Sequence, residues 1–286
     1  MSFPSWTPTT RHDAYPSIDP SRPELSSKGK VVIVTGGGRG IGRATALAFA
    51  KSGARAVIIT SRTESAIAEV AEEITKLGSE ARYFSADATD QARIQEVFGA
   101  TKAEFGSIDV VVNNAGYLPD EALIKDAQID DWWAAFEINT KGGFIAIQAF
   151  VQHASPGATL ISTVTALAHS AYYPGFSSYG ASKLALLKIM QDVHEEHPEY
   201  RVFSIQPGII DTVTSSKSKL PEQDTGKYVL LCSQCDNLRF NADRNPLHSR
   251  SPCRFHSVAF QRRIRLRQGE NVVGKLGCGR TDGQKR

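Results

Sequence analysis

Short aliphatic runs alternate with helix-period segments along the chain from Lys30 onward. The runs expected to form strands lie at residues 31–35, 56–60, 81–87, 109–113, 158–162 and 202–207, and helix patterns lie between them, at 65–77, 92–105, about 126–155 and after Ser178. Strands that are aliphatic on both faces and are separated by amphipathic helices are typical of a parallel sheet covered on both sides. The pattern therefore predicts an α/β fold with a doubly wound parallel sheet in three α/β/α layers.

The two ends of the chain lack this alternation. Residues 1–28 are rich in Pro, Ser and Thr, which predicts a mostly disordered N-terminal arm. Residues 29–226 form the expected folded domain. Residues 227–286 show no sustained strand or helix period. We therefore expect an irregular tail in which the last strand of the sheet is missing or replaced.

Charge and cysteine divide the chain at the same point. From Lys227 onward there are 13 Lys and Arg against four Asp and Glu, which leaves 20 basic and 26 acidic residues before it. All four cysteines, Cys232, Cys235, Cys253 and Cys278, lie in this basic tail. The main domain is therefore expected to fold without a disulfide framework.

We expect neither a membrane span nor a secretory signal in this sequence. No apolar run reaches the roughly 18 to 20 residues that a span requires, and the first 30 residues lack the apolar middle of a signal peptide. We expect a soluble, cytoplasmic protein with no membrane partner.

The most informative stretch is TGGGRGIG at 35–42, which joins the first expected strand to the first expected helix. Glycines at such a turn permit positive φ and a close backbone approach to a diphosphate, while the helix N-terminus offers free N–H groups. A tight turn without a ligand is the plainer interpretation of Gly36, Gly40 and Gly42. Their place after the first strand of an alternating series favours a nucleotide site.

Two further motifs, NNAG at 113–116 and Y-x-x-x-K at 179–183, follow in order. Together with T-G-x-x-x-G-x-G they resemble the NAD(P)-dependent short-chain dehydrogenase/reductase family, and the resemblance covers about residues 28–215. It implies a Rossmann-like fold, a nicotinamide cofactor and oxidoreductase chemistry on a small molecule. The family forms homo-oligomers, but the aberrant tail makes this assembly doubtful for this chain.

The resemblance also implies a set of cofactor-binding residues. These are Thr35, Gly36, Arg39, Gly40, Ile41, Gly42, Ser61, Arg62, Asp87, Asn113, Ala115, Gly116, Tyr179, Lys183, Pro207, Gly208, Ile210 and Thr212. A carboxylate at the end of the second strand would favour NAD, but Ser61 and Arg62 stand there. Because the guanidinium groups of Arg39 and Arg62 could converge on a 2′-phosphate, we expect NADP rather than NAD. The plainer interpretation of Arg62 is a solvated loop residue.

The expected catalytic group is Tyr179 with Lys183, which share one helix face four residues apart. A neighbouring ammonium and a nicotinamide cation would favour the phenolate of a tyrosine, whose ordinary pKa is about 10. The resemblance implies that Tyr179 protonates the carbonyl oxygen, that Lys183 lowers the pKa of Tyr179 and holds the nicotinamide ribose, and that Asn139 organises a proton relay. Thr165 is expected to orient the substrate oxygen, and Ser162 competes if the strand is registered three residues earlier.

The tail admits three interpretations. We considered the codons that could encode VAFQRRI at 258–264 and GENVVGKLGCGRTDGQK at 269–285, and read them one base later. Permitted codon choices then give WLSSEEF and VKMLWVNWDVDELMAK, which resemble the end of a short-chain reductase. This favours a frameshift or splice-boundary error. The alternatives are a basic arm that binds phosphates, and a zinc site formed by Cys232, Cys235, Cys253 and His256. No nucleic-acid motif is present to support the basic arm, and the spacing of the four residues fits no closed metal site well.

The sequence thus predicts an NADP-dependent enzyme that reduces a small-molecule carbonyl, or that oxidises the matching alcohol in the reverse reaction, with no metal and no nucleic-acid partner. An aromatic or polyketide-like carbonyl of biosynthetic metabolism is the expected substrate class, because aromatic side chains lie ahead of Tyr179. The competing hypothesis is an impaired relative that binds nucleotide weakly because its C-terminal region is lost.

Overall fold

The computed structural model describes residues 15–168, 174–208, 210 and 212. The expectations for the basic tail at 227–286, including the frameshift, the zinc site and the missing last strand, lie outside these residues. All described residues belong to the first of two compact units, Met1–Leu238 and Arg239–Arg286.

A six-stranded parallel sheet forms the centre of the described domain. Its strand order is β3-β2-β1-β4-β5-β6. The strands are β1 (Val31–Thr35), β2 (Ala56–Ser61), β3 (Glu80–Ser85), β4 (Val110–Asn113), β5 (Thr159–Thr163) and β6 (Arg201–Ile205). This order confirms the doubly wound α/β fold. It reverses direction between β1 and β4, and ligands of such sheets bind beyond the carboxyl ends of the strands at this crevice.

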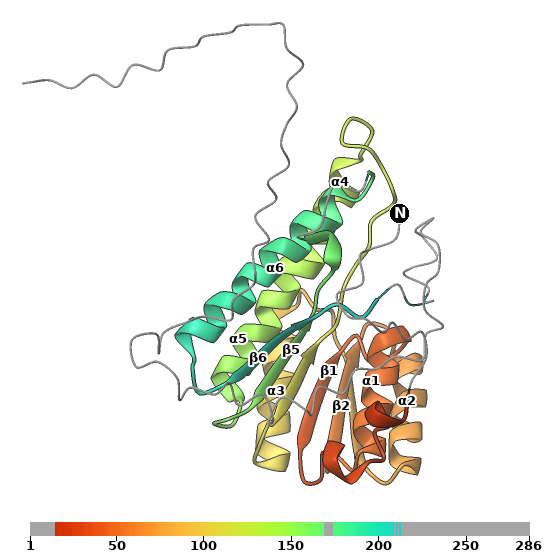
Figure 1. The fold of residues 1–286 in the computed structure, drawn as a ribbon, viewed down its shortest axis with the longest axis vertical. Coiled ribbons are helices and arrows are strands. Elements are labelled where there is room, and N and C mark those ends of the chain that lie inside the picture. The colour runs from red at the N-terminus through yellow and green to blue at the C-terminus, as the bar shows by residue number, and fades with distance from the viewer. Residues whose placement is uncertain (1–14, 169–173, 209, 211, 213–286) are drawn as a thin grey trace, which may run out of the picture. The chain divides into compact units, whose positions relative to one another are not determined.

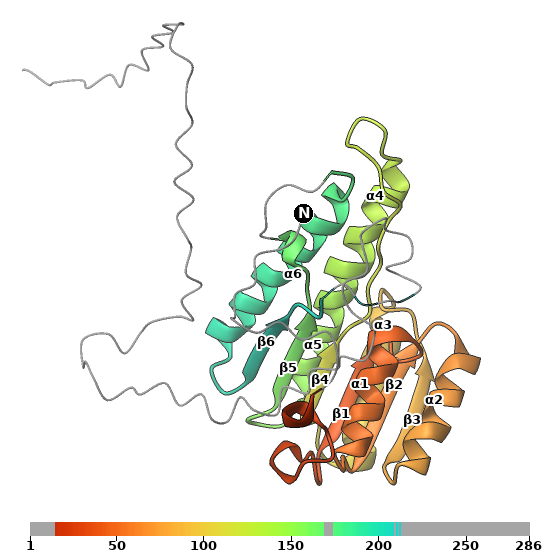
Figure 2. The ribbon, with the colours of Figure 1, turned by 45° about the vertical axis from the view of Figure 1, so that its right-hand side comes forward.

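Helices cover both faces of the sheet (Figures 1 and 2). They are α1 (Gly40–Lys51), α2 (Glu64–Lys76), α3 (Gln91–Phe105), α4 (Ile129–Ala135), α5 (Gly143–His153) and α6 (Ser177–Glu196), and a π-helix, Phe136–Gly142, joins α4 to α5. Helices α1 and α2 pack on one face and α3, α5 and α6 on the other. The three predicted layers are therefore present.

The fully buried strand β1 shows why the aliphatic runs predict this arrangement. Val31 and Ile33 belong to the core cluster under α3, α5 and α6, while Val32 and Val34 belong to the cluster under α1 and α2. Because successive side chains of a strand point to opposite faces, a strand between two helix layers must be apolar at every position.

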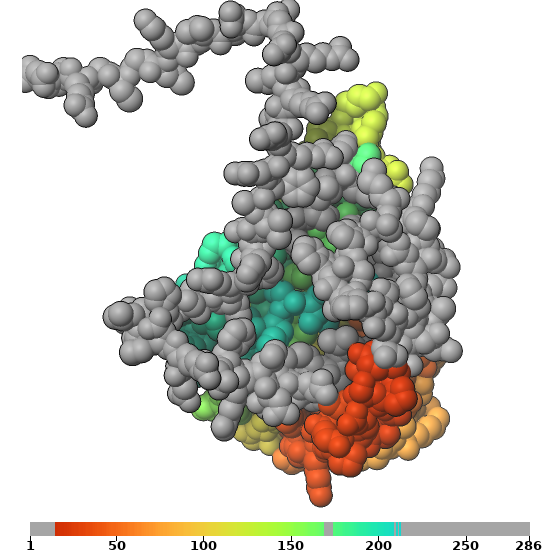
Figure 3. Space-filling view, in the orientation of Figure 1, coloured from red at the N-terminus to blue at the C-terminus, as the bar shows by residue number. Residues whose placement is uncertain are grey.

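Strand β6 is less covered than β1 within the described residues. All five of its residues are half-buried, and part of its surface is visible in teal in the space-filling view (Figure 3). The side chains of Phe203 and Ile205 still pack against the core cluster under α1 and α2.

Residues 15–28 differ from the disordered arm that composition predicts. They form two short 3-10 helices, Pro16–Ile18 and Pro23–Leu25. Leu25 is buried, and the backbone N–H of Ser27 donates a 2.8 Å hydrogen bond to the carbonyl oxygen of Ser52. This contact, together with a bridge from Lys28 to Ala54, fastens the segment beside the end of α1. Composition cannot reveal such long-range anchoring.

Candidate active site

The glycine turn between β1 and α1 is as tight as its sequence predicts. Gly36 and Gly40 adopt positive φ values of +67° and +52°, which side chains other than glycine rarely accept. At Gly42, an added Cβ would lie 2.2 Å from the carbonyl oxygen of Gly36 and 2.6 Å from Nδ2 of Asn114. The turn therefore folds back on the start of α1, and only glycine fits at Gly42.

The N-terminus of α1 is directed at this turn. Its N-cap is Arg39, which is exposed, and no side chain among the described residues caps the helix there. The first N–H groups of a helix lack partners within the helix and favour an anion. The turn and the helix end thus provide the geometry of a phosphate site.

Asn114 ties the glycine turn to the end of β4. Its Nδ2 donates to the carbonyl oxygens of Thr35 at 3.1 Å and Gly36 at 3.4 Å. In return, the hydroxyl of the buried Thr35 accepts hydrogen bonds from the backbone N–H groups of Asn114 and Ala115, each at 3.0 Å. These bonds cross the point where the strand order reverses, so they fix the two walls of the crevice relative to each other.

The side chains at the end of β2 lie beside the turn. An added Cβ on Gly38 would lie 3.3 Å from Oγ of Ser61, which places Ser61 against the glycine backbone. The exposed Arg62 guanidinium lies 3.9 Å from a carboxylate oxygen of Asp87. Hydrogen bonds from the backbone and side chain of Thr89, together with Arg62, hold the pKa of Asp87 below its usual range. Three residues predicted to bind the cofactor therefore lie close together at or just after the ends of β2 and β3: Ser61, Arg62 and Asp87.

The segment after β6 returns to the glycine turn. Cγ2 of Thr212 lies 3.2 Å from the position that a Cβ on Gly40 would occupy, and Ile210 is buried. Gly208 follows Pro207 and has a φ of +89°, a backbone conformation that glycine accepts more readily than other residues. Two distant predicted segments thus meet over the start of α1.

Helix α6 presents the Tyr179 and Lys183 pair. Nζ of Lys183 donates a 2.8 Å hydrogen bond to the carbonyl oxygen of Thr163, and the side chain is only 2% exposed. Burial lowers the pKa of Lys183 to about 8 and raises the pKa of the half-buried Tyr179 to about 12. Both shifts come from desolvation, which disfavours the charged form of each group.

Asn139 lies in the π-helix and is completely buried. Its Oδ1 accepts from the backbone N–H of Tyr117 at 2.8 Å, and its Nδ2 donates to the carbonyl oxygen of Tyr117 at 2.9 Å. An added Cβ on Gly116 would lie 3.1 Å from Oδ1 of Asn139 and 3.4 Å from Nζ of Lys183. Gly116, Asn139 and Lys183 are therefore in one cluster, and π-helical turns often mark functional sites.

The two hydroxyls predicted to compete for the substrate oxygen occupy different places. Ser162 lies inside β5 and is completely buried, and its Oγ accepts a 3.3 Å hydrogen bond from Nδ2 of Asn113. Thr165 lies two residues beyond the end of β5, and its Oγ1 accepts a 3.3 Å hydrogen bond from the backbone N–H of Leu167. Thr165 is thus at the carboxyl edge of the sheet, whereas Ser162 is within it.

Two residues that the sequence analysis did not select join this site. Asn114 makes the bonds described above, and Ser182 bonds to Asn139. The sequence signal for Asn114 was the second asparagine of NNAG. The signal for Ser182 was weaker, a small residue directly before Lys183 that the Y-x-x-x-K spacing leaves unspecified.

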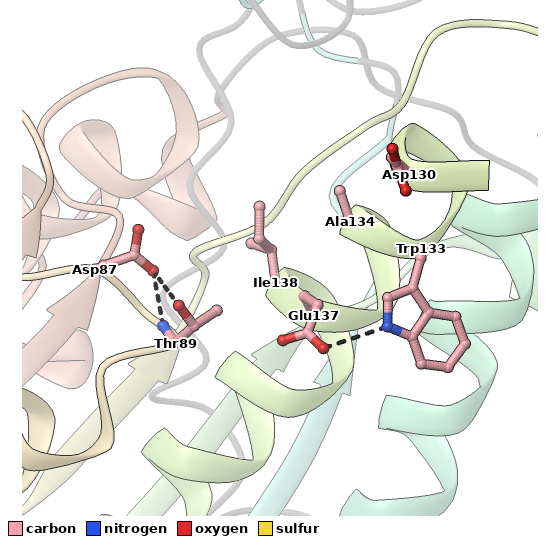
Figure 4. A pocket seen from close by; sticks show the side chains of 7 residues that line it. All are labelled: Asp87, Thr89, Asp130, Trp133, Ala134, Glu137 and Ile138. Atoms are coloured by element: carbon pink, nitrogen blue, oxygen red, sulfur yellow. Dashed lines mark hydrogen bonds between the residues drawn. The ribbon is translucent and has the colours of Figure 1, made fainter. Parts of the chain in front are cut away.

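A pocket of about 400 Å³ opens beside Asp87 (Figure 4). Its lining residues are Asp87, Thr89, Asp130, Trp133, Ala134, Glu137 and Ile138. The indole N–H of Trp133 donates a 3.3 Å hydrogen bond to Glu137, and Ile138 directly precedes Asn139. The pocket therefore lies between the predicted cofactor residue Asp87 and the π-helix that contains Asn139.

Two kinds of site are absent from the part of the chain that the structure describes. No cluster of three or more His, Cys, Asp or Glu residues suited to a metal occurs among residues 15–168 and 174–208. Within the same residues, no helix is both long and apolar enough to cross a membrane.

Comparison with known proteins gives consistent matches. The family model for short chain dehydrogenases matches residues 30–223. The short chain dehydrogenase pigC of Monascus ruber is 34% identical over 212 residues, which cover 71% of this chain and 69% of that protein. The crystal structure of a short chain dehydrogenase from Burkholderia cenocepacia J2315 in complex with NADP matches with a TM-score of 0.62 and 32% identity. The matched region covers 66% of this chain and 77% of that chain. NAD+-bound xylitol dehydrogenase has a TM-score of 0.60 and 29% identity, covering 65% and 72%.

Proposed function

The chain belongs to the short-chain dehydrogenase/reductase family, and we propose that it transfers a hydride between NADP(H) and a carbonyl or secondary alcohol of a small molecule. The proposal rests on one observation: the glycine turn, Asn114 and Lys183 all lie along the carboxyl edge of the sheet. This edge combines an anion site with a titratable pair.

The residues present fit a dinucleotide. A Cβ on Gly36 would lie 3.0 Å from Cα of Ala115, and one on Gly42 would lie 2.2 Å from the carbonyl oxygen of Gly36, so the turn keeps its tight shape only with glycine at these positions. Such a turn supports a close backbone approach to a diphosphate. We propose that the turn and the first N–H groups of α1 hold the diphosphate. Asp87, Asn113, Ala115 and Gly116 would border the adenosine and nicotinamide ends, and Ile210 and Thr212 would cover the cofactor.

The preference for NADP rests on charge at the end of β2. Ser61 stands where a carboxylate would repel a 2′-phosphate, and two exposed arginines are close to it in the chain: Arg62 follows Ser61, and Arg39 follows Gly38, whose added Cβ would lie 3.3 Å from Oγ of Ser61. Two guanidinium groups can hold a phosphate through paired hydrogen bonds. Among the structural neighbours, one holds NADP and another holds NAD+, so the charge at β2 supports the choice for this chain.

When bound, the nicotinamide ring supplies the hydride for carbonyl reduction and accepts it in alcohol oxidation. The chain's own part is to move the proton. We propose that the hydroxyl of Tyr179 donates its proton to the carbonyl oxygen in reduction and takes it back in oxidation. Its pKa of about 12 without cofactor suits a proton donor, and a positive charge on Lys183 or on the oxidised ring would lower it.

Lys183 and Asn139 would complete the proton path, and Thr165 would orient the substrate oxygen. Lys183, with a pKa of about 8, can change its charge close to neutral pH. Thr165 lies at the carboxyl edge of the sheet, where its hydroxyl can donate to a substrate oxygen. Two aromatic residues lie next to these groups along the backbone: Phe176, which is buried and directly precedes α6, and Tyr117, whose backbone N–H donates to Oδ1 of Asn139. They support an aromatic or polyketide-like carbonyl of biosynthetic metabolism as the substrate class.

The test is cofactor titration of the full chain, followed by turnover of an aromatic carbonyl probe, 9,10-phenanthrenequinone. We expect NADPH to bind more tightly than NADH. Arg62→Ala should weaken NADPH binding by roughly tenfold, the loss of about one charge-assisted contact, and leave NADH binding unchanged. The matched control is Arg82→Ala, since Arg82 is a partly exposed arginine that pairs with Glu104.

Three outcomes separate the possibilities. NADPH-selective binding with turnover supports the proposal. Equal effects of Arg62→Ala on both cofactors would overturn the assignment of NADP. Binding of NADPH without turnover of any carbonyl or alcohol would support the impaired relative instead.

A further inference from the structure

The hydroxyl of Ser182 lies at the junction of α6 with the π-helix. Ser182 is completely buried and lies between Tyr179 and Lys183 in the sequence of α6. Its Oγ accepts a 3.0 Å hydrogen bond from Nδ2 of Asn139 and donates a 3.0 Å hydrogen bond to the carbonyl oxygen of Tyr179. One hydroxyl thus connects the amide of Asn139 with the helix that carries Tyr179 and Lys183.

The direction of these hydrogen bonds is determined. Because the backbone N–H of Tyr117 can only donate, the atom of Asn139 that faces it must be Oδ1. Nδ2 then has two hydrogens, which go to the carbonyl oxygen of Tyr117 and to Ser182. Ser182 has one hydrogen, which goes to the carbonyl oxygen of Tyr179. The amide of Asn139 cannot turn over without losing these bonds.

A second bond fastens the same residue of α6. The hydroxyl of Thr140 donates a 3.0 Å hydrogen bond to the backbone carbonyl oxygen of Ser182. Asn139 and Thr140 are consecutive residues of the π-helix, and they hold the side chain and the backbone of one serine. The rotation of α6 about its own axis is therefore fixed at Ser182.

This rotation decides where two other side chains point. Residues three and four apart share a helix face, so Tyr179, Ser182 and Lys183 project toward the same side of α6. That side meets Asn139 and Gly116, whose added Cβ would lie 3.4 Å from Nζ of Lys183. A small turn of α6 would move the hydroxyl of Tyr179 and Nζ of Lys183 together.

We infer that Ser182 is a positioning residue for the proposed reaction: it locks the amide of Asn139 to α6, so that Lys183 holds its place beside Gly116 and Tyr179 keeps its orientation on the same helix. The inference rests on the proposed function, because the positioned groups are those assigned to the proton. Ser182 itself touches neither substrate nor cofactor in this scheme.

The test compares Ser182→Ala with the unchanged full chain in NADPH-dependent reduction of 9,10-phenanthrenequinone across pH. We expect kcat to fall by roughly ten- to a hundredfold, the scale of a small misplacement at a reacting centre, while the dissociation constant for NADPH changes less than about twofold. The pH profile should also shift, because loosened packing admits water beside Lys183 and moves its pKa back toward its usual range.

A second measurement does not depend on turnover. Labelling of amines with acetic anhydride at a series of pH values, followed by mass spectrometry of the Lys183 peptide, reports the pH at which Lys183 becomes reactive. We expect this midpoint to rise in Ser182→Ala. Thr140→Val, which removes only the bond to the Ser182 carbonyl, should raise it less and covers the case in which Ser182→Ala fails to fold.

The matched control is Ser178→Ala on the same helix. Ser178 is also buried, and its hydroxyl donates to the carbonyl oxygen of Trp132. Its removal should lower stability without moving the Lys183 midpoint or the pH profile. Equal behaviour of Ser178→Ala and Ser182→Ala, or an unchanged midpoint and profile in Ser182→Ala and Thr140→Val, would overturn the inference. A shifted midpoint in a chain that shows no turnover would keep the positioning and reject the proposed reaction.

Discussion

Nζ of Lys183 donates a 2.8 Å hydrogen bond to the carbonyl oxygen of Thr163, the last residue of β5. This bond joins the helix that carries Tyr179 to the carboxyl edge of the sheet. It also leaves an ammonium group almost fully buried beside a neutral acceptor. The fold therefore retains a charge that burial disfavours, and stability and function are expected to make opposite demands at this position.

Replacing Lys183 by Met should stabilise the chain while abolishing turnover. The folded-state pKa of about 8 lies below the ordinary 10.5, so the unfolded chain binds this proton more strongly. Below pH 8 the buried ammonium of Lys183 lowers the free energy of unfolding, and this loss of stability disappears as the pH rises from 8 through 10.5. We expect Lys183→Met to raise the free energy of unfolding at pH 7 by about 1 to 3 kcal/mol. Each unit of the Lys183 pKa shift corresponds to about 1.4 kcal/mol of gain, and the loss of the hydrogen bond to Thr163 offsets part of this gain.

Urea unfolding at pH 7 and at pH 10 would check this prediction. The gain from Lys183→Met should shrink at the higher pH. Lys188→Met is the control, because Lys188 lies on the same helix, is 64% exposed and pairs with Asp192. Its loss should change stability by less than about 0.5 kcal/mol. A gain of the same size at both pH values would contradict the burial argument.

Replacing Gly42 by Ala should damage the cofactor site. Its Cβ would lie 2.2 Å from the carbonyl oxygen of Gly36, a backbone atom that cannot move without opening the turn. We expect Gly42→Ala to lower the free energy of unfolding by about 1 to 3 kcal/mol through overpacking, and to weaken NADPH binding in a fluorescence titration by more than tenfold as an order-of-magnitude estimate.

The matched control is Gly99→Ala within α3. A Cβ on Gly99 would meet no atom within 4 Å, and its backbone is helical. Because alanine is the better helix former by up to about 1 kcal/mol, this variant should be neutral or more stable. NADPH binding that is equally affected in both variants would show that the turn does not hold the cofactor.

Asn114→Asp should separate the two walls of the crevice. The amide of Asn114 donates to the carbonyl oxygens of Thr35 and Gly36, and a carboxylate would place oxygen against both. We expect a loss of about 1 to 3 kcal/mol in the free energy of unfolding, the penalty for unsatisfied buried polar groups. Weaker NADPH binding should accompany it. Gln148→Glu on α5 provides an amide-to-carboxylate control, because its oxygen already accepts from Gln91 and can continue to do so.

The strands were predictable because their environment is uniform. The run VVIVT at 31–35 became β1 over the same residues, and AVIIT at 56–60 became β2 with one residue added. A strand covered by helices on both faces must be apolar throughout, so periodicity alone reveals it. The glycine turn was predictable for a similar reason, since positive φ at Gly36 and Gly40 restricts the residue type locally.

The hydrogen bonds that assemble the site were not predictable in this way. The partners Thr35 and Asn114 are 79 positions apart, and Asn139 and Ser182 are 43 positions apart. Polar pairs of this kind form only after the sheet and helices have packed, so no local pattern marks them. The π-helix at Phe136–Gly142 is likewise a tertiary feature, because its sequence continues the helix period of α4 and α5.

The choice between Thr165 and Ser162 as the substrate-orienting hydroxyl gives the last prediction. Ser162 accepts a hydrogen bond from Asn113 inside the sheet and is completely enclosed, so a substrate cannot reach it. Thr165 lies beyond the end of β5, and a hydroxyl that accepts a hydrogen bond, as Oγ1 of Thr165 does from the backbone N–H of Leu167, can still donate one. Thr165→Val should therefore lower kcat by roughly a hundredfold, as loss of an oxyanion-type donor does, and Thr165→Ser should retain most activity. Ser162→Ala should cost about 1 kcal/mol of stability, the value of one buried hydrogen bond, with kcat reduced far less. The reverse order of kcat losses, measured with saturating NADPH, would assign the role to Ser162 and would require β5 to shift its register.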